Sequence, residues 1–151
     1  MLSILNRCPQ YPAPHAQLER VLGGTWKRRG CGRVTLNLML VEDRQMRRLN
    51  QGHRKRRTTT DVLAFADGDA DPVTRVNHLG DIAVSVDTAR REAKKRNLRI
   101  RDEVTLYALH GLLHLLGMRD DTEAGRKAMV QAQVEVFRQY GLSVDMVLDD
   151  E

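Results

Sequence analysis

The chain has 151 residues, 41% of them hydrophobic and 30% charged, which favours one soluble globular domain over residues 1–151. A net charge of +5 and a pI of about 9.6 favour a polyanionic partner, while one Trp, three Tyr and two Phe are too few for an aromatic platform that stacks nucleic-acid bases. We identify no signal peptide and no apolar run long enough to span a membrane. The two cysteines lack the spacing of a disulfide framework, which is typical of reduced thiols. We therefore expect a cytoplasmic protein with no membrane partner.

The first half of the chain is expected to contain three strands and two helices. Apolar and β-branched residues predict the strands at 2–5, 34–41 and 61–66. Apolar residues at helical spacing predict the helices at 16–22 and 43–50. Gly23-Gly24 is expected to end the first helix, and the strand DVLAFA at 61–66 is too apolar for the edge of a sheet.

The second half is expected to be mostly helical. A polar, turn-rich segment at 67–78 is expected to be the most mobile part of the chain, and a strand follows at 79–86. Three helices are predicted, at 87–97, at 101–116 and from a cap at Asp121 or Thr122 to Tyr140. The acidic tail DMVLDDE is expected to be frayed. These four strands and about five helices indicate an α+β protein.

The segment LYALHGLLHLLGMRDD at 106–121 carries the clearest chemical signal. His110 and His114 are one helical turn apart, so both imidazoles leave the same face and can bind one metal ion. Gly117 is expected to end the helix and Met118 to pack back onto Leu113. The turn would bring Asp120 or Asp121 toward the histidines. Three protein ligands leave one position open, which is typical of a catalytic metal.

The same spacing has an ordinary structural explanation, because two histidines on an apolar helix are often core or surface residues. This helix is apolar nearly all round, however, and two buried imidazoles without partners would each cost a few kcal/mol. The acidic residues after the glycine supply a partner, which favours the metal site.

A basic cluster occupies residues 44–57, where no acid follows Asp43. Its seven cations are Arg44, Arg47, Arg48, Arg54, Lys55, Arg56 and Arg57. The cluster is either a solvated charged surface or a patch that contacts the phosphates of RNA. A second basic run at 90–101 has the same two explanations, with the solvated helix face preferred.

The stretch HGLLHLLGMRD resembles the signature HGxLHLxGYDH of the YbeY family, bacterial metal-dependent endoribonucleases of rRNA maturation. The three histidines of that signature bind zinc, and the first two align with His110 and His114. The third aligns with Asp120, and Met118-Arg119 replaces the Tyr-Asp pair. The resemblance implies one divalent ion, zinc by expectation, at His110, His114 and Asp120. A carboxylate in place of an imidazole also suits iron, manganese or nickel.

Residues 49–65 resemble a second stretch of the family, N-x-x-x-R…T-D-V-L-S-F, through Asn50, Arg54 and TDVLAF at 60–65. This match implies that Arg54 lies in the active-site cleft and orients the phosphate; Lys55, Arg56 and Arg57 are assigned to RNA binding with less support. The segment LGDI at 79–82 also matches. Its Asp81 either orients a metal-bound histidine or, as we prefer, is a structural acid at a strand start.

The resemblance implies a small mixed four-stranded sheet flanked by helices, with the metal site in a cleft. It also implies a metal-dependent, single-strand-directed endoribonuclease that acts on rRNA and the small ribosomal subunit. One alternative is a non-catalytic RNA-binding assembly factor with a structural metal. The other, a metallopeptidase, is disfavoured because Gly111 replaces the general-base glutamate of HExxH. No phosphate-binding loop or GxGxxG is present, so no nucleotide cofactor is expected.

Overall fold

The structure is a computed structural model that describes residues 1–52, 61–66 and 71–148. Its sheet has the strand order β1-β2-β4-β3. The strands are β1 (Leu2–Asn6), β2 (Val34–Val41), β3 (Val62–Ala66) and β4 (Asn77–Ser85). β1, β2 and β4 run parallel, while β3 is antiparallel to β4. The predicted α+β class and mixed four-stranded sheet are therefore confirmed.

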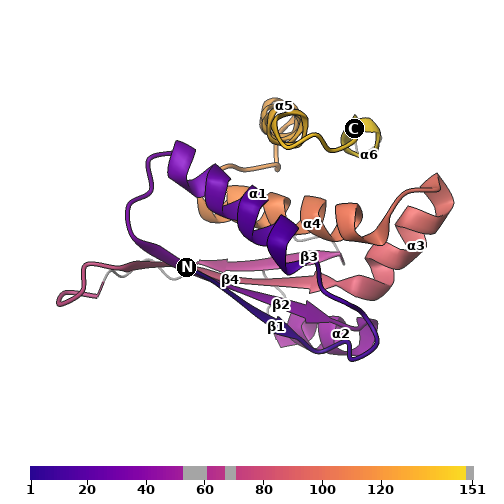
Figure 1. Cartoon of the computed structure of the whole chain (residues 1–151), viewed down its shortest axis with the longest axis horizontal. Coiled ribbons are helices and arrows are strands. Elements are labelled where there is room, and N and C mark those ends of the chain that lie inside the picture. Colours follow the sequence, from indigo (N-terminus) through magenta and orange to yellow (C-terminus); the bar gives the residue numbers. More distant parts are fainter. Residues whose placement is uncertain (53–60, 67–70, 149–151) are drawn as a thin grey trace.

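The described helices form layers on the sheet. They are α1 (His15–Arg28), α2 (Asp43–Gly52), α3 (Val86–Arg96), α4 (Ile100–Leu115), α5 (Glu123–Gln139) and α6 (Asp145–Leu148). α1 and α4 lie on one face, α5 and α6 lie beyond them, and α2 lies on the opposite face (Figure 1). α4 is therefore enclosed between the sheet and α5, which explains why it is apolar nearly all round. Among these described helices, none has both the length and the apolar character needed to cross a bilayer.

The first helix extends beyond the position predicted from its glycines. α1 continues through Gly23-Gly24 to Arg28, so the expected end at these residues is wrong. A Cβ atom at Gly24 would lie only 1.7 Å from the hydroxyl oxygen of Tyr140. Gly24 thus makes room for a side chain from the distant end of α5, and this close approach, rather than helix termination, explains the glycine.

β3 lies at the edge of the sheet as far as the described strands show, so the expectation that it is too apolar for an edge is wrong. Both of its faces are nonetheless covered. Val62 belongs to the main core beneath α4, whereas Leu63 belongs to a second cluster with Met46 of α2. An edge strand can be this apolar because helices cover it on each side.

The acidic tail is more ordered than its composition predicted. Residues 145–148 form the single turn α6, and the Val147 side chain is fully buried. The expectation of a frayed tail is therefore wrong for this turn, because one apolar side chain fastens it to α5. The segment 67–78 also differs from expectation, since β4 begins at Asn77, while 67–70 lies outside the described residues.

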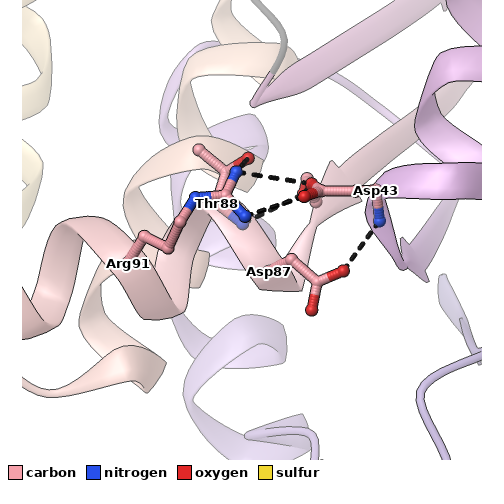
Figure 2. Close-up of polar contacts among 5 residues, drawn as sticks. Asp43, Asp87, Thr88 and Arg91 are labelled. Carbon is pink, nitrogen blue, oxygen red and sulfur yellow. Dashed lines mark hydrogen bonds and ion pairs between the residues drawn. The ribbon is translucent and has the colours of Figure 1, made fainter.

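A polar network joins the start of α2 to the start of α3 (Figure 2). The Asp43 carboxylate accepts hydrogen bonds from the Arg91 guanidinium at 2.7 Å and the Ser85 hydroxyl at 3.0 Å. The main-chain N–H of Asp43 donates to the Asp87 carboxylate at 2.8 Å. The Arg91 hydrogen bond is the largest of the effects that hold the pKa of Asp43 below its ordinary value of 3.8.

Candidate metal centre

α4 ends in the turn that the sequence predicted. The main-chain N–H of Met118 donates to the Leu113 oxygen at 3.0 Å, and that of Gly117 donates to the His114 oxygen at 3.0 Å. Gly117 has φ of +100°, a conformation that residues with a Cβ rarely adopt. This pair of hydrogen bonds defines a Schellman ending, which reverses the chain directly after His114.

The start of α5 holds the returning chain in place. Thr122 caps this helix by accepting a hydrogen bond from the N–H of Gly125 at 3.0 Å, so Thr122, and not Asp121, is the cap. A Cβ atom at Gly125 would lie 2.3 Å from the main-chain oxygen of Arg119. The missing side chain therefore allows residues 119–120 to lie against the first turn of α5, and this contact places Asp120.

Three potential ligand atoms meet where the loop returns to α4. The Nε2 atoms of His110 and His114 are 3.0 Å apart, and Asp120 Oδ2 lies 3.2 Å and 3.3 Å from them. All three side chains are partly buried. A tetrahedral zinc ion with ligands at about 2.05 Å holds its ligand atoms about 3.3 Å apart. The triangle formed by the three atoms therefore fits one such ion with little rearrangement.

The outer nitrogen of each imidazole is held by a hydrogen bond. His114 Nδ1 donates to the main-chain oxygen of Met118 at 3.0 Å, since a carbonyl can only accept. His110 Nδ1 lies 2.8 Å from the amide oxygen of Gln133 on α5 and donates to it. A neutral imidazole that donates through Nδ1 presents a lone pair at Nε2. In their neutral form, both rings are therefore held in the tautomer that binds a metal through Nε2.

When both imidazoles are neutral, the arrangement of acceptor atoms in the cluster favours a bound cation. Two Nε2 lone pairs and a carboxylate oxygen, all hydrogen-bond acceptors in these protonation states, lie within 3.3 Å of one another. Acceptors at this distance repel unless a proton or a metal ion lies between them. A divalent ion removes this repulsion at all three atoms at once, which supports the metal-binding interpretation.

Gly111 faces the sheet rather than the potential ligands. A Cβ atom at Gly111 would lie 2.8 Å from Cγ2 of Ile82 on β4. A glutamate at this position, where HExxH peptidases carry their general base, would have no room without displacing the core. The close packing of α4 on β4 gives the glycine a structural explanation.

A cavity of about 600 Å³ opens beside the cluster, and the cleft expected at the metal site is thus present. Its walls include the start of β3, the face of α4 that carries His110, the loop at Asp120 and the first half of α5. Two of the three potential ligands therefore face a space large enough for a small ligand.

Two other residues singled out in the sequence, Asp121 and Asp81, have partners outside the cluster. Asp121 forms a 2.9 Å ion pair with Arg119. Asp81 contacts Asn37 at 2.9 Å and His78 at 3.1 Å; its neighbour Ile82 faces α4, so alternation along β4 puts Asp81 on the opposite face of the sheet. Arg54, Lys55, Arg56 and Arg57 lie outside the described residues, so their roles stay predictions.

Two residues that shape the site were not recognised from the sequence, namely Gln133 and Gly125. Gln133 carried a usable signal, because it follows Met129 and precedes Phe137 by four residues each, on the inward face of α5. A glutamine on a buried face needs a hydrogen-bond partner, and a histidine is a suitable one. Gly125 carried no such signal, because its contact with Arg119 depends on the path of the loop.

Fold and site together define a small α+β protein with a His₂-carboxylate cluster at the end of a buried helix. The family described as Endoribonuclease YbeY matches residues 13–141, well beyond the motifs noted in the sequence. The chain belongs to the YbeY family.

Curated relatives agree with this assignment. Proteins named Endoribonuclease YbeY from Myxococcus xanthus and Anaeromyxobacter dehalogenans are 39% and 38% identical to it, over 78% and 71% of this chain. The matched regions span only 40% and 54% of those two relatives. A relative of the same name from Syntrophotalea carbinolica is 31% identical, over 91% of this chain and 93% of its own length.

A solved structure supports the fold. The solution structure of a protein from Thermotoga maritima superposes with a TM-score of 0.56 and covers 93% of this chain and 91% of its own. The two sequences are 24% identical, so this likeness bears on the fold alone.

Proposed function

We propose that this chain is a metal-dependent endoribonuclease domain that cleaves single-stranded RNA, with one divalent ion held by His110, His114 and Asp120. The observation that carries the proposal is the convergence of these three ligand atoms to within 3.3 Å on the wall of a cavity, in a member of the YbeY family. The relatives' name supports an endoribonuclease, and the family resemblance extends the proposal to rRNA processing and to maturation of the small ribosomal subunit in the cytoplasm.

Zinc is the proposed ion. The separations of the three atoms suit its short bonds, and the two Nδ1 hydrogen bonds favour the imidazole tautomer that zinc requires. The carboxylate of Asp120 lowers the charge of the occupied site from two positive charges to one. This change weakens the attraction for phosphate and makes iron or manganese better competitors than at a site of three imidazoles.

Side chains of the protein would do most of the positioning of the RNA substrate. A bound ion would act as a Lewis acid: it would polarise a phosphoryl oxygen and lower the pKa of water toward about 7. Arg54, the family's active-site arginine by alignment, would hold the phosphate through two parallel hydrogen bonds and offset the charge that develops on it. Lys55, Arg56 and Arg57 would attract the RNA backbone.

The packing of Gly111 on Ile82 argues against a peptidase, because it leaves no room for a glutamate base on α4. A non-catalytic RNA-binding factor remains the competing function, since it could use the same metal cluster as a structural element. Cleavage of single-stranded RNA that stops when a chelator is added, and resumes with zinc, would separate the two. RNA binding without cleavage under both conditions would favour the assembly factor.

The metal assignment is tested by the zinc content of the purified protein. His114→Ala should lose most of the bound zinc, whereas His15→Ala, at the exposed start of α1, should retain it. Equal zinc in wild type and His114→Ala would refute the site.

The role of Arg54 is tested by a variant that spares the metal. Arg54→Ala should keep its zinc but lower the cleavage rate by about two to three orders of magnitude, the usual effect of removing one electrostatic contact to a transition state. Arg29→Ala is the matched control, because Arg29 lies at the exposed end of α1. Loss of zinc and of cleavage together in Arg54→Ala would mean that Arg54 is structural.

A further inference from the structure

Apolar side chains form part of the wall of the cavity beside the metal centre, whose lining also includes Asp61, Asp120 and Glu123. Val62 of β3, Leu106 of α4 and Met129 of α5 line it, and each side chain is at most 3% exposed. Its volume of about 600 Å³ lies within the range of about 300–1,000 Å³ that holds small ligands. A cavity of this size, with buried apolar side chains in part of its wall, suits a flat, largely apolar group such as a nucleobase.

A hydrogen-bond donor faces the same space. Gln133 lines the cavity and is 3% exposed. Its amide oxygen accepts a hydrogen bond from His110, and its amide nitrogen has no hydrogen-bond partner among the described residues. This nitrogen can therefore donate to an acceptor on a ligand or on water. The carbonyl oxygens and ring nitrogens of nucleobases are such acceptors.

A nucleotide also has a phosphate, which needs a cation. Arg126 provides this cation at the rim of the cavity. Its Nη1 atom lies 3.5 Å from the main-chain oxygen of Asp120, so the guanidinium stands next to the third potential ligand. Lys127 also lines the cavity, but its ammonium is 3.5 Å from the carboxylate of Glu123. Arg126 is thus the cation of the described rim that is placed to contact a phosphate beside the metal.

We infer that this cavity is a subsite for one nucleotide of single-stranded RNA next to the scissile phosphate. The base enters between Val62 and Met129 and accepts a hydrogen bond from the Gln133 amide, while Arg126 holds the adjoining phosphate. Unstacked bases are what proteins recognise in single-stranded RNA, and a duplex cannot offer one. The inference rests on the proposed function and gives it a reason for single-strand preference.

Binding, measured apart from cleavage, tests the subsite. The probe is a fluorescently labelled single-stranded oligoribonucleotide, and its anisotropy is measured with the zinc-loaded protein. Gel electrophoresis of the same samples checks that the probe is still intact when the anisotropy is read. Arg126→Ala should weaken binding about tenfold and reduce the slope of log K against log salt by about 0.7, the value for one phosphate contact on a single strand. Arg138→Ala, exposed near the end of the same helix, should change neither.

A second variant fills the cavity. Val130→Trp should weaken binding of the oligoribonucleotide about tenfold and leave the zinc content unchanged, whereas Ala128→Trp, on the exposed side of α5, should bind as wild type does. Wild-type binding by both Arg126→Ala and Val130→Trp would overturn the subsite even if the protein cleaves RNA. Weakened binding by both, in a protein that does not cleave RNA, would keep the subsite and refute the nuclease.

Discussion

The amide oxygen of Gln133 lies 2.8 Å from Nδ1 of His110, so a side chain of α5 orients a ring of the candidate metal centre on α4. Gln133→Leu removes the acceptor and leaves the Nδ1–H group without a partner. Loss of a residue that hydrogen-bonds to a metal-binding histidine typically lowers metal affinity by about 10–100-fold. We expect zinc affinity to fall by about that factor in a competition titration with a zinc-binding dye. Gln131→Leu, at an exposed position of α5, is the control and should bind zinc as wild type does.

Gly125→Ala is expected to weaken the metal centre although alanine is the better helix former. The substitution favours a helix by about 1 kcal/mol in general, but here its Cβ would meet the Arg119 oxygen at 2.3 Å. The loop must move, and Asp120 moves with it. We expect about tenfold weaker zinc binding with unchanged helix content by circular dichroism. Gly32→Ala, where a Cβ has open space, should have no effect; unchanged zinc affinity in Gly125→Ala would show that the loop adapts.

Asp120 can be exchanged for the histidine that the family signature carries. Asp120→His should retain zinc because a third imidazole replaces the carboxylate, while Asp120→Ala should lose affinity because only two ligands remain. Manganese should bind less well to Asp120→His than to wild type, since a carboxylate suits that ion better. Calorimetric titration with zinc and with manganese measures the affinity of all three proteins for each metal. Equal zinc affinity in Asp120→Ala and wild type would remove Asp120 from the site.

The network at Asp43 makes part of the stability depend on pH. Because Arg91 and Ser85 hold the folded-state pKa of Asp43 below its ordinary value of 3.8, the charged carboxylate stabilises the fold. This stabilisation is complete above the unfolded pKa and is lost as the pH falls through the lower, folded-state pKa. Urea denaturation should therefore find Asp43→Asn less stable than wild type at pH 7, with the difference shrinking below about pH 4. A difference that is constant with pH would contradict this account.

The predictions that succeeded concern local patterns. The end of α4 follows from Gly117 and Met118, because a Schellman turn is specified by residues within six positions of one another. The predictions that failed depend on distant partners: Gly24 lies inside α1, where its missing Cβ makes room for Tyr140, and β3 tolerates an edge because α2 and α4 cover it. The partner of Gln133 also lies on another helix, although the position of Gln133 on the inward face of α5 was a usable signal.

All three prospective ligands come from residues 110–120 of one continuous segment, which matters for how the protein folds. Bringing them together closes only a short loop, and the entropic cost of closure grows with loop length. An unfolded chain can therefore already chelate the ion weakly. Since an ion that also binds the denatured ensemble raises the melting temperature less, metal should protect this protein from heat less than its native-state affinity alone implies.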